Sequence, residues 1–261
     1  MKKILITNDD GFHSEGLNVL KETLEKIGEV IVVAPDKERS AVSFSLTLHR
    51  PLRVTELKKN FFIVDGTPAD CINIALKNLM DEMPSLVVSG INLGPNLGDD
   101  TLFSGTVSAA IQAVLFGIPS IAISAISKDG KFYLEESAKV AFSLSKWVLK
   151  NGLPDGIVLS VNVPPPPILG LKLTSLGRKR YSPDIIERVD PRGRKYFWIG
   201  NGNPVLEGSE ETDVGATKNQ YISITPIHLD LTAKAYLEKL KKSEFLQFLT
   251  EGTKEIFNKE F

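Results

Sequence analysis

Ile4-Leu5-Ile6-Thr7-Asn8-Asp9-Asp10-Gly11 is the stretch that decides the fold we expect for this chain. It begins with aliphatic and β-branched residues, which is typical of a strand buried in a parallel sheet. Two adjacent carboxylates, Asp9 and Asp10, follow the apolar run directly. Open α/β sheets bind their ligands at the carboxyl ends of the strands. The two aspartates are therefore the first candidates for a functional site.

The aspartate pair allows two interpretations. Neighbouring side chains of a strand point to opposite faces, so Asp9 and Asp10 reach one point only if the chain turns, which Gly11 permits. Two like charges held close together are tolerated chiefly when a proton or a cation lies between them. Oxygen ligands beside the amide of Asn8 favour a hard ion such as Mg²⁺, Mn²⁺ or Ca²⁺ over zinc. Alternatively, one aspartate caps the next helix while the other is solvated.

Outward from this stretch, apolar runs alternate with helical periodicity through about the first 125 residues, which is the pattern of a doubly wound parallel sheet. We expect an α/β fold on this ground. Strands are predicted at residues 3–7, 29–34, 85–89, 120–124 and 156–161. Helices are predicted at residues 15–27, 69–80, 104–116 and 134–149.

The chain changes character after Val163, where four consecutive prolines, 164–167, can continue neither a helix nor a central strand. We expect residues 1–163 to form the core, with an antiparallel excursion at about 43–64. Residues 164–261 are expected to form a smaller, hairpin-rich region that ends in an amphipathic helix at 232–257. Such a helix packs on its own domain or is exchanged between subunits.

Composition excludes several classes of protein. Among 261 residues, 31 basic side chains stand against 32 acidic ones, so nothing favours duplex nucleic acid or an anionic membrane as a partner. The single Cys71 forms no internal disulfide and is expected to be a packed hydrophobe. Met1 leads straight into the first strand without a signal-peptide pattern, and no apolar stretch approaches the roughly 20 residues of a membrane span. We expect a cytoplasmic protein.

Two further loops follow predicted strands, at residues 34–41 and 89–100, and the second leads into Ser104-Gly105-Thr106 at the start of a helix. Free N–H groups and the helix dipole make such an end suitable for a phosphate. Hydroxyl capping alone also explains Ser104 and Thr106. A cation site beside an anion cradle, however, forms the two halves of a metal-assisted phosphoryl-transfer site.

Six stretches of the chain then resemble the SurE family of survival-protein phosphatases, which dephosphorylate nucleoside 5′-monophosphates. They occur in the family's order and are Thr7–Gly11, Ala34–Ala41, Gly66–Cys71, Ser89–Gly98, Ser104–Val107 and Tyr221–Pro226. The resemblance implies a Rossmann-like core, a hairpin that supports a homodimer, an exchanged C-terminal element and often a homotetramer. Base preference and cleavage of 3′-nucleotides or polyphosphate stay open.

The resemblance also implies the site residues. One divalent ion per subunit, Mg or Mn, would be held by Asp9, Asp10, Ser40 and Asn92. The substrate phosphate would lie near Asn8, Asn96, Ser104, Gly105 and Thr106, and the catalytic residues would be Asn8, Asp9 and Asp10. Two departures are a glutamine, Gln112, where many members carry an acid, and a loosely matched segment at 201–219.

Mechanistic alternatives remain at this stage. Asp9 or Asp10 orients a water, or Asp9 is a covalent nucleophile, which coordination to a cation disfavours. His13 is either a proton donor or a solvated or packed side chain. A dinucleotide-dependent oxidoreductase needs G-x-G-x-x-G in the first turn, where this chain has Asn8-Asp9-Asp10. A regulatory nucleotide- or metal-binding module is compatible with the sequence.

Overall fold

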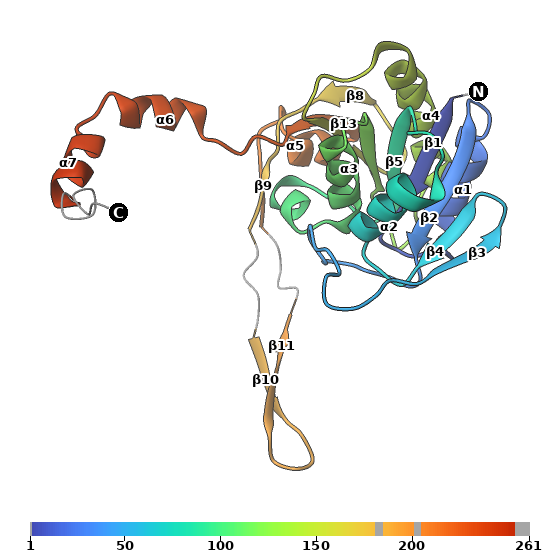
Figure 1. Cartoon of the computed structure of the whole chain (residues 1–261), viewed down its shortest axis with the longest axis horizontal. Helices are drawn as coiled ribbons and strands as arrows, with labels where there is room; N and C mark the ends of the chain where they lie inside the picture. Colours follow the sequence, from blue (N-terminus) through green and yellow to red (C-terminus); the bar gives the residue numbers. More distant parts are fainter. Residues whose placement is uncertain (1, 181–184, 201–204, 254–261) are drawn as a thin grey trace, which may run out of the picture. The chain divides into compact units, whose positions relative to one another are not determined.

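A nine-stranded sheet forms the centre of the computed structural model, which describes residues 2–180, 185–200 and 205–253. The strand order is β3-β4-β2-β1-β5-β6-β7-β13-β8 (Figure 1). The strands are β1 (Lys3–Thr7), β2 (Glu29–Pro35), β3 (Val54–Lys58), β4 (Phe61–Val64), β5 (Leu86–Leu93), β6 (Ser120–Ala125), β7 (Ile157–Val163), β8 (Gly170–Leu173) and β13 (Tyr221–His228). β1 pairs in parallel with both β2 and β5, so the first strand lies inside the sheet.

Helices cover both faces of this sheet. On one face, α1 (Glu15–Leu24) and α4 (Leu134–Asn151) share a core cluster with Ile4 and Ile6. On the other, α2 (Pro68–Ile74) and α3 (Gly105–Leu115) share a cluster with Leu5. Alternate residues of β1 thus feed opposite cores, as a strand buried on both faces requires. The doubly wound α/β fold is confirmed.

Local differences from the expected elements have identifiable causes. The helix expected at 69–80 begins one residue earlier, with Thr67 and Asp70 forming a capping box, and ends in a π-helical turn, η1 (Ala75–Leu79). Cys71 is buried in the α2 cluster, which confirms that it is a packed hydrophobe. In the expected antiparallel excursion only β3 pairs antiparallel, with β4, whereas β4 also pairs in parallel with β2.

The chain after residue 163 contributes to the central sheet as well as to hairpins. β8 and β13 pair in parallel, and β13 adjoins β7. Two antiparallel pairs lie outside the sheet, β9 (Arg178–Arg180) with β12 (Val205–Glu207) and β10 (Ile185–Val189) with β11 (Lys195–Ile199). A short helix, α5 (Asp213–Lys218), precedes β13. Contacts divide the chain at residues 227 and 228, so the boundary we expected at 163 falls inside the first compact unit.

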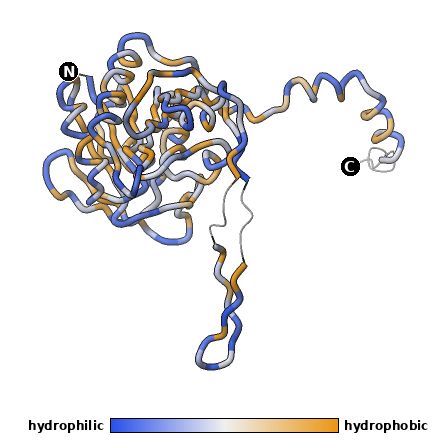
Figure 2. The backbone as a smooth tube through the Cα atoms, turned by 180° about the vertical axis from the view of Figure 1, so that it is seen from behind, coloured by the Kyte–Doolittle hydropathy of each residue, from blue (hydrophilic) through white to orange (hydrophobic). Residues whose placement is uncertain are grey.

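The second unit spans residues 228–261, and its described part, up to residue 253, contains two helices where we expected one at 232–257, a range whose last four residues lie outside the described part. The two helices are α6 (Lys234–Lys241) and α7 (Phe245–Gly252). The break lies at Ser243, whose hydroxyl donates to Leu240 O and accepts from Phe245 N, so local bonds replace helical ones. Polar and apolar stretches alternate along both helices (Figure 2). None of the helices in the described residues has the length and apolarity to cross a membrane.

Candidate functional site

The predicted site residues meet at the carboxyl ends of the central strands, around a pocket of about 580 Å³. Those that line it are Asp9, Asp10, Ser40, Asn92, Asn96 and Ser104. Asn8, Gly105 and Thr106 are buried and do not line the pocket. The loops after β1, β2 and β5 therefore converge, as expected from their places at parallel strand ends.

The turn after β1 is fixed by its own residues. Gly11 has a φ of +94°, and a Cβ there would lie 2.9 Å from the carbonyl carbon of Lys37. The Asn8 side chain donates a 3.0 Å hydrogen bond to Gly11 O, and Arg39 N donates a 2.7 Å bond to Asp9 O. Asn8 thus braces the turn, while its Oδ1 is buried without a hydrogen-bond partner in the described residues.

Asp9 is held by the N-terminus of α3. Its Oδ1 accepts a 2.6 Å bond from the Thr106 hydroxyl, and its Oδ2 accepts a 3.2 Å bond from Thr106 N. A Cβ on Gly105 would lie 2.8 Å from Asp9 Oδ2, so only glycine lets the carboxylate approach this closely. The anion seated at this helix end is therefore the Asp9 carboxylate itself.

Ser104 is the member of this turn that faces the pocket. Its Oγ accepts from Val107 N at 3.1 Å and caps α3, as hydroxyl N-caps do. The hydroxyl proton of Ser104 is left available to a ligand. Because Thr106 N already bonds Asp9, the amide of Gly105 is the first-turn donor without a hydrogen bond among the described residues.

Asp10 lies beside Asp9 under a different constraint. Its Oδ2 accepts a single 3.1 Å bond from Leu93 N. Burial, followed by the charge of Asp9, raises the pKa of Asp10 to about 6. Burial also raises the pKa of Asp9, against the bonds from Thr106. Neither aspartate pairs with Lys, Arg or His in the described part of the chain, so the site lacks a positive charge at its centre.

Asn92 and Ser40 present neutral oxygens to the same pocket. Asn92 donates its amide N–H to Gly94 O at 2.7 Å, which leaves its Oδ1 free of that bond. The Ser40 hydroxyl donates to Glu38 Oε1 at 2.6 Å and keeps its lone pairs. Glu38 also lines the pocket and was missed by the sequence analysis, although it stands two residues before Ser40 in a quoted motif.

Asn96 is positioned by the neighbouring strands. Its backbone N donates to Asn162 Oδ1 at 2.8 Å, and Asn162 Nδ2 donates back to Asn96 O at 3.0 Å. The Asn96 amide bonds the Ser124 hydroxyl at 2.8 Å, and this hydroxyl can donate as well as accept. Ser124 and Asn162 were not predicted; they are polar residues near the carboxyl ends of β6 and β7, which also contain Ser120 and Ser160.

The pocket lining also includes an ion pair that sequence reasoning missed. Lys179 Nζ lies 2.6 Å from Asp100 Oδ2, and Lys179 N donates to Asp99 Oδ2 at 2.9 Å. Both side chains of the ion pair line the pocket. β9 is thereby tied to the 3₁₀ turn η2 (Gly98–Leu102), which leads into Ser104. Lys179 gave no signal because it lies 79 residues from Asp100 in sequence.

Two other residues singled out from sequence lie outside the pocket. His13 is exposed, and its ring lies 3.6 Å from that of Phe12 between centroids. Gln112 is buried and donates to Asn73 Oδ1 at 2.6 Å, which links α3 to α2. Gln112 therefore serves helix packing in this chain.

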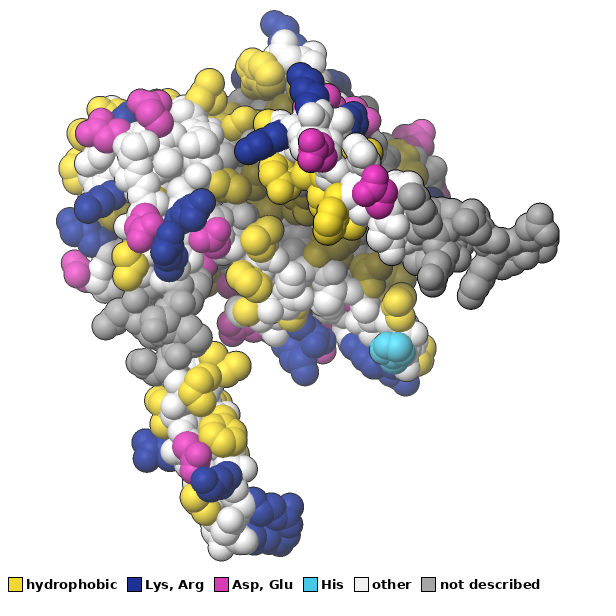
Figure 3. Space-filling view, turned by 90° about the vertical axis from the view of Figure 1, so that its left-hand side faces the viewer, with side chains coloured by type: hydrophobic (Ala, Val, Ile, Leu, Met, Phe, Trp, Pro, Cys, Tyr) yellow, Lys and Arg dark blue, Asp and Glu magenta, His cyan; other side chains and the backbone are white. Residues whose placement is uncertain are grey.

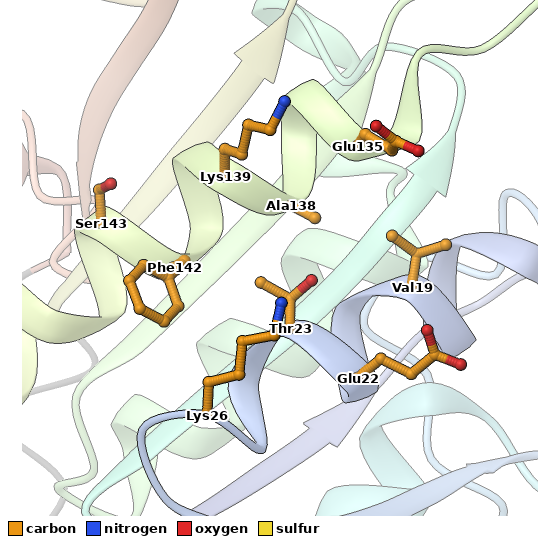
Figure 4. A pocket seen from close by; sticks show the side chains of 9 residues that line it. All are labelled: Val19, Glu22, Thr23, Lys26, Glu135, Ala138, Lys139, Phe142 and Ser143. Carbon is orange, nitrogen blue, oxygen red and sulfur yellow. The ribbon is translucent and has the colours of Figure 1, made fainter.

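A second cavity, of about 600 Å³, lies between α1 and α4. Val19 and Thr23 face it from α1, and Ala138 and Phe142 from α4 (Figure 4). Glu22 of α1, Lys26 just after that helix, and Glu135 and Lys139 of α4 also line it. None of the predicted site residues belongs to this cavity, so we place the functional site at the strand ends.

Comparisons with known proteins show what the whole chain is similar to. A family model described as survival protein SurE matches residues 4–183. The 5′-nucleotidase SurE of Geobacter sulfurreducens is 51% identical over 241 residues, covering 91% of this chain and 92% of the relative. That of Moorella thermoacetica is 46% identical over 257 residues, covering 95% and 98%. The crystal structure of the SurE protein from Aquifex aeolicus superposes with a TM-score of 0.79 at 40% identity, covering 94% and 99%.

Proposed function

Since the chain belongs to the survival protein SurE family, we propose that its strand-end pocket hydrolyses nucleoside 5′-monophosphates to nucleoside and phosphate. Relatives named 5′-nucleotidase match about nine-tenths of the chain. One observation carries the assignment to this pocket. The adjacent carboxylates of Asp9 and Asp10 lie together at the end of β1, with raised pKa values and beside the N-terminus of a helix.

The same pocket suits a divalent metal ion, and we propose one ion per subunit, Mg²⁺ or Mn²⁺. Its ligands would be the carboxylates of Asp9 and Asp10 with the neutral oxygens of Ser40 and Asn92. Two carboxylates without a basic partner in the described residues, in an all-oxygen donor set, are what a hard cation requires. When bound, such an ion polarises a phosphoryl oxygen and lowers the pKa of a water molecule.

The two aspartates have different roles in the proposed reaction. Both oxygens of Asp9 accept bonds from Thr106, whereas Asp10 accepts one bond from Leu93 N. We assign orientation of the attacking water, and acceptance of its proton, to Asp10, because it keeps more of its accepting capacity. A covalent role for Asp9 is disfavoured by its two bonds to Thr106.

Phosphate contacts follow from the donors that face the pocket. The Ser104 hydroxyl can donate to a phosphoryl oxygen while its Oγ still caps α3. The Asn96 amide can turn its NH₂ group into the pocket and keep its bond to Ser124, because that hydroxyl donates equally well. Gly105 does not line the pocket, but its N–H is the next backbone donor at the helix end, beside Ser104. Asn8 and Thr106 act through the turn and through Asp9, as positioning residues.

Phosphate release from a panel of nucleoside monophosphates tests the proposal. Metal-stripped protein is assayed with and without Mn²⁺ or Mg²⁺, beside Asp9→Asn and the exposed control Asp81→Asn. We expect metal-dependent release that Asp9→Asn abolishes and Asp81→Asn leaves intact. Saturable nucleotide binding without release under any metal would favour a regulatory binding module instead. The same panel, extended to 3′-nucleotides and polyphosphate, defines the substrate range.

We propose that the protein works in the cytoplasm as a homodimer or homotetramer, without a nucleic-acid or membrane partner. A near-neutral charge and one buried free thiol support this setting. Apolar side chains gather on the β10–β11 hairpin, among them Phe197 and Trp198, which are 57% and 63% exposed (Figure 3). Exposed apolar patches of this kind are typical of association surfaces.

A further inference from the structure

The strand-end pocket has more room than a metal ion and a phosphate need. Its volume of about 580 Å³ lies in the range of sites for whole small molecules, roughly 300–1,000 Å³. Its acidic and amide groups gather around Asp9 and Asp10. Five other lining residues are apolar, namely Ala41, Leu93, Pro95, Phe103 and Ile199, and the Asp100–Lys179 ion pair lines the pocket as well. A ligand that fills this pocket therefore meets apolar side chains as well as charged ones.

Phe103 is the aromatic residue among those that line the pocket. Its side chain is 57% exposed, although aromatic rings usually gain stability by burial. No other ring stacks on it in the part of the chain that the structure describes. The exposed ring thus offers a face to a ligand in the pocket.

The backbone around Phe103 is fixed. Phe103 N donates to Asp100 O at 2.9 Å, and Phe103 O accepts from Ser43 N at 3.0 Å. The next residue is Ser104, whose hydroxyl faces the pocket. A ring one residue from a phosphate donor, on a backbone held from both sides, is a preorganised platform.

We propose that Phe103 stacks against the nucleobase of the substrate and so confers the preference for nucleotides over simpler phosphate esters. This inference rests on the proposed function, because it concerns the same pocket. A nucleoside monophosphate holds its base one sugar away from the phosphate, which matches the order of Phe103 and Ser104 along the wall. Stacking accepts every base, since every base has a π face, so it selects nucleotides as a class.

Steady-state kinetics with two substrates isolates this contact. AMP and ribose 5-phosphate share the phosphate and the sugar, and only AMP carries a base. We expect Phe103→Ala to raise the KM for AMP roughly 5- to 100-fold, the range set by one lost base–aromatic stack, with kcat little changed. The KM for ribose 5-phosphate stays the same. Phe103→Tyr retains the wild-type KM for AMP. Phe103→Leu keeps the bulk without the π face, so its KM for AMP lies between those of the wild type and Phe103→Ala.

Leu102→Ala is the matched control. Leu102 is 62% exposed, adjoins Phe103 in sequence and does not line the pocket. If Phe103 served only the local fold or a contact with another copy of the chain, Phe103→Ala would change the KM for AMP and the KM for ribose 5-phosphate equally. That result, or equal KM values for AMP and ribose 5-phosphate in the wild type, would overturn the inference.

Binding separates this inference from the proposed reaction. The non-hydrolysable phosphonate analogues of AMP and of ribose 5-phosphate are titrated calorimetrically in the presence of Mn²⁺. We expect Phe103→Ala to weaken the binding of the AMP analogue and to leave the binding of the ribose 5-phosphate analogue unchanged. An absence of hydrolysis in the wild type would refute the phosphatase, while the two titrations would still decide whether Phe103 contacts a base. Equal weakening of the binding of both analogues would refute the stacking of Phe103 on a base.

Discussion

At the scale of single residues, one carboxylate pair dominates the chemistry of this chain. Asp9 and Asp10 are neighbours in sequence but differ in support, because Thr106 binds both oxygens of the first and Leu93 N binds one oxygen of the second. Burial raises the pKa of both side chains. The metal-free site therefore favours the uptake of protons, and a divalent cation competes with them.

The pKa of Asp10 predicts how stability depends on pH without metal. Its value is about 6 in the folded chain against an ordinary 3.8, so the folded state binds more protons between about pH 4 and pH 6. The free energy of unfolding therefore decreases as pH rises through this window. Thermal unfolding of the metal-free protein across the window measures the decline. We expect Asp10→Asn to reduce it, and Mn²⁺ at neutral pH to restore stability by binding the folded state.

The exposed control Asp81→Asn keeps the full decline. A decline in Asp10→Asn as large as in the wild type would show that the raised pKa of Asp10 has no effect on stability.

Thr106 is predicted to act through Asp9. Replacing Thr106 with Val removes the hydroxyl that bonds Asp9 Oδ1 and keeps the side-chain shape. We expect kcat/KM to fall roughly ten- to a hundredfold, since a hydrogen bond to a charged group is worth about 1.5–3 kcal/mol. Mn²⁺ affinity, measured by titration of the metal-stripped protein, should fall as well. Thr106→Ser, which keeps the hydroxyl, should retain both; full activity in Thr106→Val would contradict the positioning role.

At the scale of elements, the site depends on connections between segments that are separate in sequence. Asp213, at the start of α5, is 1% exposed. Its Oδ2 accepts from Gly98 N at 2.7 Å, and its Oδ1 accepts from Gly177 N at 2.7 Å and from Val214 N at 2.8 Å. One buried carboxylate thus joins η2, the residue before β9, and α5, and η2 and β9 also carry the Asp100–Lys179 ion pair.

Asp213→Asn is predicted to destabilise the fold. An amide has one accepting oxygen, so at least one of the three N–H groups would face an NH₂ group, at a cost of roughly 1–3 kcal/mol. For a chain of this size, that lowers Tm by roughly 3–10 °C. Thermal unfolding measures the change, with the exposed Asp155→Asn as the control. An unchanged Tm would mean that the three bonds contribute little.

The elements also show where sequence patterns reach their limit. Periodicity located α1, α3 and α4 because each presents an apolar face to the sheet. It did not locate the break between α6 and α7, since the apolar spacing continues across Ser243 while local hydroxyl bonds end the helix. The prolines at 164–167 indicated an exit from the core. The chain nevertheless returns to the sheet as β8 and β13. This return was not predicted, because nothing in the local sequence encodes which strand a segment pairs with.

At the scale of the whole molecule, the exposed apolar side chains of the β10–β11 hairpin predict assembly. We expect light scattering to give the mass of a dimer or tetramer. Trp198→Glu should shift the mass toward the monomer, because it places a charge in an apolar contact. Arg192→Ser, in the turn of the same hairpin, should leave the mass unchanged. A monomeric wild type would contradict the proposed assembly.

The sequence by itself determined the wound α/β core and indicated that the loops after the first parallel strands meet at one edge, while its resemblance to the SurE family named Asp9, Asp10, Ser40, Asn92, Asn96 and Ser104 as residues of one site. Hydrophobic periodicity is a local signal, and parallel strands bring their carboxyl ends to the same edge. Only the tertiary structure decided how these residues are held. Thr106 meets Asp9 across 97 residues, and Asn162 meets Asn96 across 66. Such contacts depend on strand order and close approach in space, which local sequence does not specify.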